Sequence, residues 1–354
     1  HRVDRRQRQM CIRDRLYEAP VSVIPPNYNT PLASLYFVLA KNDPWVDDND
    51  PPQPTQDQAS LKQFLKSVFV AKYVPSNNIS PVIERRDWTQ NMVYDYYDDT
   101  IDMFELDDNG FLIYNFYVKN RYDQVFKCLW NNNGGPSLYE PYFEPGSYNT
   151  NNIYQNNDGY KWKYIFTVDS AAKVKFMDSL WIPVPIGLNT PNPLYNLNTG
   201  QPAAAGVGNI DVINVTNGGS GYTSNSIITV TVTGDGTGAT ASATLANGSI
   251  SDIIVTNPGS NYTYASVTIS SNFGSGATAI APVSPIGGHG FDAASELGCS
   301  RAMVTSEFNG SENGIIPTDV TYYQAGILIN PTTQGLSGLP ANASIYSTTT
   351  DLIV

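Results

Sequence analysis

An internal repeat in the second half of the chain constrains the fold more than any other feature. The sequence IDVINVTNGGSGYT at 210–223 matches ISDIIVTNPGSNYT at 250–263, which is a spacing of 40 residues. Each copy continues into a Ser-, Thr- and Val-rich run and then a Gly-x-Gly-Ala-Thr segment, at 236–240 and 274–278. Because β-branched runs between glycine turns are typical of strands, we expect a small all-β module over residues 206–283.

Composition extends the β prediction to the rest of the chain. Charged residues make up only 15% of the sequence, against roughly 25% in ordinary globular proteins, and Asn, Thr, Gly, Pro and 23 Tyr take their place. These residues are weak helix formers. Apolar runs at 35–40, 111–118 and 125–130 have the length of strands. We therefore predict a mainly β, multi-domain chain with a few helices, made of β-sandwich-like domains and the small all-β repeat module.

The segment DGYKWKYIFTV, residues 158–168, alternates with the period of a strand. Its Asp158–Gly159 pair is typical of a hairpin turn. Lys161 and Lys163 are expected on the polar face. The side chains expected to pack on the other face are Tyr160, Trp162, Tyr164, Phe166 and Val168. The proline-containing segment that follows, 181–187, is typical of an edge strand or of an exit from the sheet.

One amphipathic helix is predicted over about residues 60–73. Its apolar side chains recur at helical spacing, and they are Leu61, Phe64, Leu65, Val68 and Phe69. Ser60 and Gln63 fit a capping box at its start, and Pro75 would end it.

The expected domain organisation follows from these segments. Residues 1–15, which hold six Arg, resemble a translated sequencing adapter and are expected to be a non-native tail. The remaining divisions are an N-terminal β-rich domain at 16–187, a linker at 188–205, the repeat insertion at 206–283, and a C-terminal β segment at 284–354 that packs back on the first domain.

Charge excludes two classes of partner. The net charge is −12, and Arg301 is the one basic residue beyond Lys175. Groove binding to nucleic acid needs clustered basic residues, so direct nucleic-acid binding is not expected. No stretch reaches the ~20 apolar residues of a membrane-spanning helix, and an acidic surface disfavours anionic membranes.

The sequence offers no strong catalytic or metal-binding motif. Three cysteines lie far apart, and the chain has only two histidines. His289 could in principle pair with Cys299, but we expect it to fix a loop and to pair with Asp292. Acidic residues are plentiful enough to leave paired carboxylates for glycoside hydrolysis open, and the segment YDYYDDT at 94–100 has the aromatic and acidic mix of a sugar site, although no single acid stands out. Our prediction is a protein that is not an enzyme and has no metal and no cofactor.

The stretch VIERRDW, residues 82–88, raises a different possibility. Arg85 and Arg86 are flanked by Glu84 and Asp87, so the local charge is neutral. Arginine forks hold carboxylates in two-pronged pairs and stack on aromatic rings such as Trp88. In a chain with few basic groups, we expect these arginines to anchor an internal or intersubunit network.

Several segments together carry a resemblance to a known family. NDPW at 42–45, VIERRDW, VFKCL at 125–129, DGYKWKYIFTV and YYQAGILINP at 322–331 occur in one order. In this order they resemble the dimeric baseplate wedge subunit of T4-like contractile-tailed phages, and SPIGGHGFDAASELG at 284–298 resembles its cyanophage versions. The residues that the resemblance marks as structural or interface candidates are Arg85, Arg86, Asp87, Trp88, Asp158, Gly159, Tyr160, Trp162, Tyr164, His289, Asp292, Tyr322, Tyr323 and Gln324.

The resemblance implies a structural role in the virion. The family protein is non-enzymatic, mostly β and assembled in the host cytoplasm, and it joins other wedge proteins in the baseplate. A homodimer and wedge-protein partners are therefore expected, with the 206–283 module as an insertion relative to T4. Two alternatives stay open: a carbohydrate- or receptor-binding tail protein, and a tail-associated glycosidase.

Overall fold

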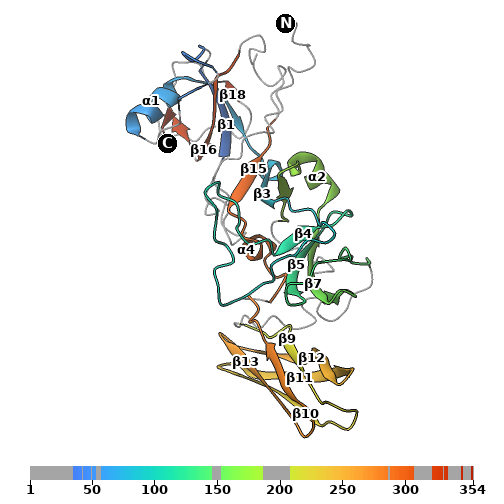
Figure 1. Cartoon of the computed structure of the whole chain (residues 1–354). Coiled ribbons are helices and arrows are strands. Elements are labelled where there is room, and N and C mark those ends of the chain that lie inside the picture. The colour runs from blue at the N-terminus through green and yellow to red at the C-terminus, as the bar shows by residue number, and fades with distance from the viewer. Residues whose placement is uncertain are drawn as a thin grey trace. The chain divides into compact units, whose positions relative to one another are not determined.

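The computed structural model describes residues 35–41, 43–48, 50–52, 57–145, 153–185, 208–285, 288–306, 321–329, 331–333, 344–345 and 352–353. Within these residues the fold is mainly β, with antiparallel sheets and three short α-helices (Figure 1). The fold class predicted from the sequence is therefore confirmed. None of the helices in this part of the chain has the length and apolar character that crossing a membrane requires. The predicted tail and linker, 1–15 and 188–205, lie outside the described residues.

The chain forms two compact units. The first comprises His1–Pro81, Val174–Phe176 and Ser300–Val354, and the second comprises Val82–Lys173 and Met177–Cys299. The elements of the first unit are β1 Leu35–Ala40, α1 Gln58–Lys66, β2 Val68–Tyr73, η3 Ser76–Asn78, β15 Arg301–Val304, β16 Gln324–Ile329, β17 Thr332–Thr333, β18 Ser344–Ile345 and β19 Leu352–Ile353. Those of the second are β4 Tyr117–Lys119, β5 Gln124–Asn131, β6 Ile153–Gln155, β7 Tyr160–Thr167, β8 Trp181–Pro183, β9 Asn214–Ser220, β10 Ile228–Gly234, β11 Thr237–Ala246, β12 Ser249–Ser260, β13 Ala265–Ser271, β14 Ser275–Ile280 and α4 Ala293–Glu296. Strand β3 Ile79–Glu84 and helix α2 Ser170–Phe176 contribute residues to both units.

The first unit is built on a sheet with the strand order β16-β1-β2-β18. All six residues of β1 are buried, so its two faces serve two apolar clusters. Tyr36 and Val38 pack with Phe64 of α1 on one face, whereas Phe37 and Leu39 belong to the cluster on the other. The predicted strand at 35–40 is confirmed, and its lack of polar alternation follows from this double burial.

The predicted helix at 60–73 is wrong in both its limits and its cap. Helix α1 begins after Asp57, whose carboxylate accepts the backbone N–H groups of Ala59 and Ser60, and it ends at Lys66. Residues 68–73 form strand β2, which pairs with β1. Val68 and its β-branched and aromatic neighbours suit a strand, and pairing with a buried strand outweighs the helical spacing of the apolar residues.

A sheet with the order β4-β5-β7-β6 forms the centre of the second unit. Strands β5 and β7 confirm the predictions at 125–130 and 158–168. A hairpin turn joins β6 to β7, with the N–H of Gly159 donating to the carbonyl of Asn156 at 3.0 Å. Among the described residues β8 pairs with β3 alone, which matches the predicted edge strand.

The predicted strand at 111–118 is wrong except at its last two residues. Only Tyr117–Lys119 joins the sheet, as β4. Earlier in the segment, Leu112 pairs with Leu106 in an isolated bridge. The carbonyl groups of Leu112 and Tyr114 accept hydrogen bonds from the Arg86 guanidinium. The Arg86 side chain therefore takes the place of a neighbouring strand, because it donates hydrogen bonds to carbonyl groups that would otherwise pair within a sheet.

Both faces of β7 are buried, which corrects the prediction of a polar face. Tyr160, Trp162 and Tyr164 belong to an aromatic cluster on one face. Lys161 and Lys163 are only 6% and 4% exposed on the other. The period-two pattern gave the correct alternation, but the lysine face is covered by protein.

The repeat folds into six strands around one apolar cluster. Strand β9 of the first copy pairs with β14 of the second, and β12 of the second pairs with β11 of the first. Strands β10 and β13 pair directly. Each copy therefore completes its sheet with a strand of the other copy.

Side-chain packing also links the two copies, because a tyrosine of each copy lies against a glycine of the other. Tyr222 and Tyr262 are both buried in the module. A Cβ at Gly274 would lie 2.6 Å from the ring of Tyr222, and a Cβ at Gly236 would lie 2.4 Å from the ring of Tyr262. The Gly-x-Gly-Ala-Thr segments are needed because each leaves room for the tyrosine of the opposite copy.

Candidate interaction site

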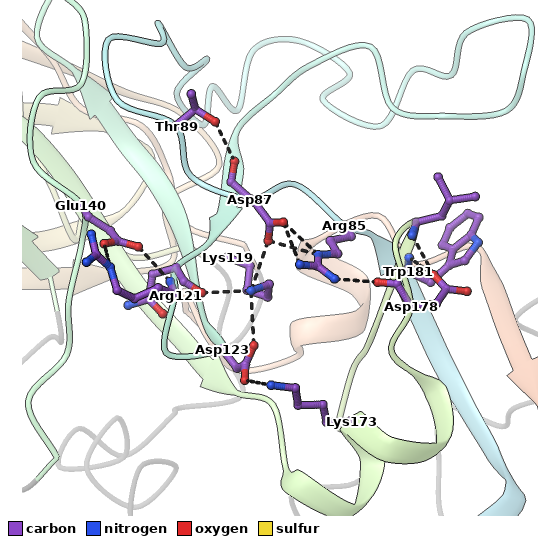
Figure 2. A network of polar contacts seen from close by, with 12 residues as sticks. Arg85, Asp87, Thr89, Lys119, Arg121, Asp123, Glu140, Lys173, Asp178 and Trp181 are labelled. Carbon is purple, nitrogen blue, oxygen red and sulfur yellow. Dashed lines mark hydrogen bonds and ion pairs between the residues drawn. The ribbon is translucent and has the colours of Figure 1, made fainter.

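The RRDW motif directly follows β3 and lies at one end of a network of polar contacts. Arg85 forms an ion pair with Asp87, with Nη2 and Oδ2 2.9 Å apart. Its Nη1 donates to the carbonyl of Asp178 at 2.8 Å. Figure 2 shows Arg85 between these two partners, which come from different segments of the chain.

Arg86 is more deeply enclosed than Arg85. Its side chain is 12% exposed and pairs with Glu84 at 2.6 Å. Its guanidinium also donates to the carbonyl groups of Tyr114 and Leu112 and lies 5.5 Å from the ring centroid of Tyr117. All these partners belong to the same chain, so Arg86 fixes the path of residues 112–114.

Asp87 continues the network into the central sheet. Lys119 Nζ lies 3.1 Å from Asp87 and 3.3 Å from Asp123, and Lys173 pairs with the other oxygen of Asp123 (Figure 2). Burial alone would raise the pKa of Asp87, but hydrogen bonds from Arg85 and Lys119 hold it below its usual value. Basic and acidic side chains therefore alternate along the network, and each charge lies next to an opposite one.

Trp88 and the DGYKWKY segment meet around a shared loop. The Trp88 indole donates to the hydroxyl of Ser137 at 3.0 Å, and the Tyr160 hydroxyl donates to the carbonyl of Gly135 at 2.6 Å. Burial raises the pKa of Tyr160 to about 12. Asp158 accepts the N–H groups at 138 and 139. The structure thus brings the two motifs together on the loop that follows β5.

His289 lies in a second polar cluster, and its predicted pairing with Asp292 is wrong. Its Nδ1 is 3.2 Å from Lys127 Nζ, and Lys127 also pairs with Glu296 at 3.3 Å. All three side chains are at most 3% exposed. Asp292 instead caps α4 by accepting the N–H of Ser295. The His289 contacts therefore hold the segment around α4 against β5.

Opposing effects set the protonation of this cluster. Burial would raise the pKa of Glu296, but the Lys127 charge and the N–H of Gly290 bring it to about 2. Burial and Lys127 lower the pKa of His289. Lys127 also lies 3.8 Å from the ring centroid of Tyr97. Such a closed cluster suits internal support, because no member reaches the surface.

Lys161 of β7 connects the repeat module to the central sheet. Lys161 Nζ lies 2.8 Å from Asp252 and 3.0 Å from the carbonyl of Ile213. The Asn214 amide donates to the carbonyl of Leu129 at 2.9 Å. The insertion is therefore attached through buried polar contacts as well as through the chain that enters and leaves it.

The remaining candidates belong to the first unit. The carbonyl of Tyr323 accepts the indole N–H of Trp45 at 3.2 Å, and the ring of Tyr322 contacts Phe69. Gln324 pairs with Ala40 at the start of β16. These three residues support the edge of the β1 sheet.

Sequence reasoning missed the partners that complete the networks. They are Lys119, Lys127, Lys161, Asp123, Asp252 and Glu296. The lysine partners could have been recognised from the sequence, because lysines inside the apolar runs of β5 and β7 are unusual in a chain so poor in basic residues. The described residues contain no group of three His, Cys, Asp or Glu side chains that could hold a metal ion.

These contacts give the candidate site a supporting role. The charged side chains of both clusters are engaged with internal carboxylates and carbonyl groups, whereas large apolar side chains remain exposed elsewhere in the second unit. No protein-family model and no curated protein matches the chain.

Proposed function

We propose that this chain is a structural component of a contractile phage tail, a baseplate wedge subunit that joins neighbouring wedge proteins through protein–protein interfaces. The order of the RRDW, DGYKWKY and YYQAGILINP segments supports the proposal by resemblance. On this proposal the chain is not an enzyme and uses no cofactor. It lies in the virion after assembly in the host cytoplasm, as a homodimer with wedge-protein partners and without direct contact to nucleic acid or membrane.

The observation that carries the proposal is the set of large side chains left on the surface of the second unit. Tyr122 and Tyr142 are 57% and 43% exposed, and their rings lie 5.0 Å apart. Tyr139 and Leu138 are exposed nearby in sequence. Tyrosine is enriched where proteins meet, and apolar patches on a surface mark contact sites. Exposed aromatic groups combined with internally paired charges favour assembly over catalysis.

The direct test is to locate the chain in tail particles. Antibody labelling and electron microscopy of purified tails should place it in the baseplate, in a fixed number of copies. Co-expression with the other wedge proteins of the same phage should yield a complex on size-exclusion chromatography. A chain that is absent from tails and stays alone in co-expression would refute the proposal.

A carbohydrate-binding tail protein is the second candidate, because the repeat module exposes aromatic rings beside uncharged strands. Tyr264 and Phe273 are 62% and 52% exposed. Thr229, Thr231 and Thr233 point outward from β10. Glycan-array binding that is lost on Tyr264→Ala and Phe273→Ala substitution would favour this function.

A further inference from the structure

The segment of residues 98–113, here called the acidic loop, combines two features that the networks above do not explain. Residues 87–118 contain eight acidic and no basic residues. Within the acidic loop, several apolar side chains are also exposed to solvent. The loop belongs to the second unit and contains no α-helix and no strand longer than a single bridge.

The backbone of the acidic loop forms a closed hairpin. The N–H of Ile113 donates to the carbonyl of Glu105 at 3.0 Å, and the N–H of Asp107 donates to the carbonyl of Phe111 at 2.8 Å. Between these, the N–H of Gly110 returns to the carbonyl of Asp107 at 2.9 Å. The loop therefore has a defined conformation before any partner arrives.

Its aspartates also shape the turns. Asp98 accepts the N–H of Thr100, Asp102 accepts that of Phe104, and Asp107 accepts that of Asn109, each at 2.9 Å. These bonds lock the backbone as Asx turns do. A preorganised surface loses little entropy on binding, which suits the loop to a specific contact.

The apolar side chains divide into an anchoring and an exposed set. Met103 and Leu112 are 3% and 8% exposed and enter the core of the second unit. Ile101, Leu106 and Ile113 are 45%, 46% and 51% exposed. Phe104 is exposed to a similar degree. The loop is thus held by its buried residues while presenting others outward.

The carboxylates of the acidic loop have no internal counter-charge. Among the described residues none of them takes part in an ion pair, and they are Asp98, Asp99, Asp102, Glu105, Asp107 and Asp108. In the described part of the molecule they do not gather into a metal-binding group. Asp87 and Glu296 have cationic partners, whereas these six carboxylates have none among the described residues. The carboxylates of Glu105 and Asp108 are the most exposed to a basic partner, because they also accept no hydrogen bond there.

We infer that the acidic loop is the docking surface for a basic, apolar-bearing segment of a different protein subunit. The inference rests on the proposed function and specifies the chemistry of one neighbour. The charge pattern excludes the other occupants, since nucleic acid and anionic membranes would be repelled. Apart from residues 1–15, which are expected to be a non-native tail, a second copy of the chain has 14 basic and 30 acidic residues, so complementary charge points to a different polypeptide.

The first experiment uses the full chain and a synthetic peptide of alternating Lys and Leu, with binding measured by fluorescence anisotropy. A Glu105→Lys/Asp108→Lys variant reverses two exposed charges that form no side-chain hydrogen bond in the described structure. An Ile101→Ser/Ile113→Ser variant removes the exposed apolar groups. Each variant should lower the affinity by about tenfold or more.

Matched controls separate this surface from general attraction to an acidic protein. Asp50→Lys and Ile254→Ser change an exposed acid and an exposed isoleucine elsewhere in the chain, and both should bind the peptide as the parent does. Peptides of Glu and Leu, or of Lys and Ser, should bind weakly. Equal affinity of all variants for the Lys–Leu peptide would overturn the inference, even if the chain is found in tails.

The second experiment uses intact tail particles and a carbodiimide, which couples a carboxylate directly to a lysine amine with loss of water. Mass spectrometry should find Glu105 or Asp108 joined to a lysine of another polypeptide. A chain that is present in the particles with these carboxylates free would overturn the docking surface and leave the proposed function standing. Absence of the chain from the particles would refute the proposed function. The peptide-binding experiment alone would then test whether the acidic loop is a docking surface.

Discussion

Lys127 and Glu296 are 169 positions apart in the sequence, yet their Nζ and Oε2 atoms lie 3.3 Å apart and both side chains are at most 3% exposed. The pair joins strand β5 to the segment that returns from the repeat module. A buried ion pair contributes little net stability compared with an apolar pair, but losing one partner leaves the other charge unpaired. The integrity of the second unit therefore depends on both residues.

The first prediction concerns this pair. Glu296→Gln keeps the shape of the side chain but removes the counter-charge of Lys127. We expect the free energy of unfolding to fall by about 3–5 kcal/mol, the usual effect of breaking a buried ion pair. Urea denaturation followed by tryptophan fluorescence measures it. The double variant Lys127→Met/Glu296→Leu should recover much of the loss, and a double variant no more stable than Glu296→Gln would contradict this account.

The same cluster predicts a loss of stability in acid. The pKa of Glu296 falls from an ordinary 4.5 to about 2 in the folded chain, so its contribution is complete above pH 4.5 and disappears as the pH approaches 2. His289 also has a lowered pKa, and its stabilising effect begins to decline below its ordinary value of 6.5. Denaturation at a series of pH values should show both changes. Glu296→Gln should flatten the part between pH 4.5 and 2, and an unchanged slope there would contradict the assignment.

The contrast between β1 and α1 shows what the sequence could predict. The six apolar residues of β1 need only burial to become a strand, and their limits were predicted correctly. For α1 the apolar spacing continued past Lys66, and only the pairing of β2 with β1 ended the helix there. Local periodicity cannot reveal where a helix ends when that end depends on the pairing of the next segment with another strand.

The candidate site shows the same limit at the level of side chains. The sequence singled out Arg86 and His289 because both are rare residue types in their surroundings. It did not supply their partners, because the carbonyl of Leu112 and the carboxylate of Glu296 meet them only after folding. Asp292, the nearer acid, was the wrong partner for His289 because it is used as the cap of α4.

Arg86 and Arg85 make a matched pair for the next prediction. Arg86 is 12% exposed and binds two carbonyl groups besides Glu84, so Arg86→Ala should lower the free energy of unfolding by about 3 kcal/mol. Arg85 is 28% exposed beside a half-exposed Asp87, and Arg85→Ala should change it by about 1 kcal/mol or less. Thermal melting and size-exclusion chromatography measure both. A parent-like melting curve for Arg86→Ala would show that its contacts do not support the fold.

The last prediction tests the exchange between the two repeat copies. Gly274 and Gly276 both have positive φ angles, +84° and +81°, so alanine at either position introduces backbone strain of about 1–2 kcal/mol. A Cβ at Gly276 has no neighbour closer than 3.8 Å, whereas a Cβ at Gly274 would press against the ring of Tyr222. Overpacking of this kind adds about 1–3 kcal/mol. Gly274→Ala should therefore unfold the module at a clearly lower urea concentration than Gly276→Ala, as measured by hydrogen exchange of β9 and β14 amides. Equal protection in the two variants would mean that the tyrosine of one copy does not rest on the glycine of the other.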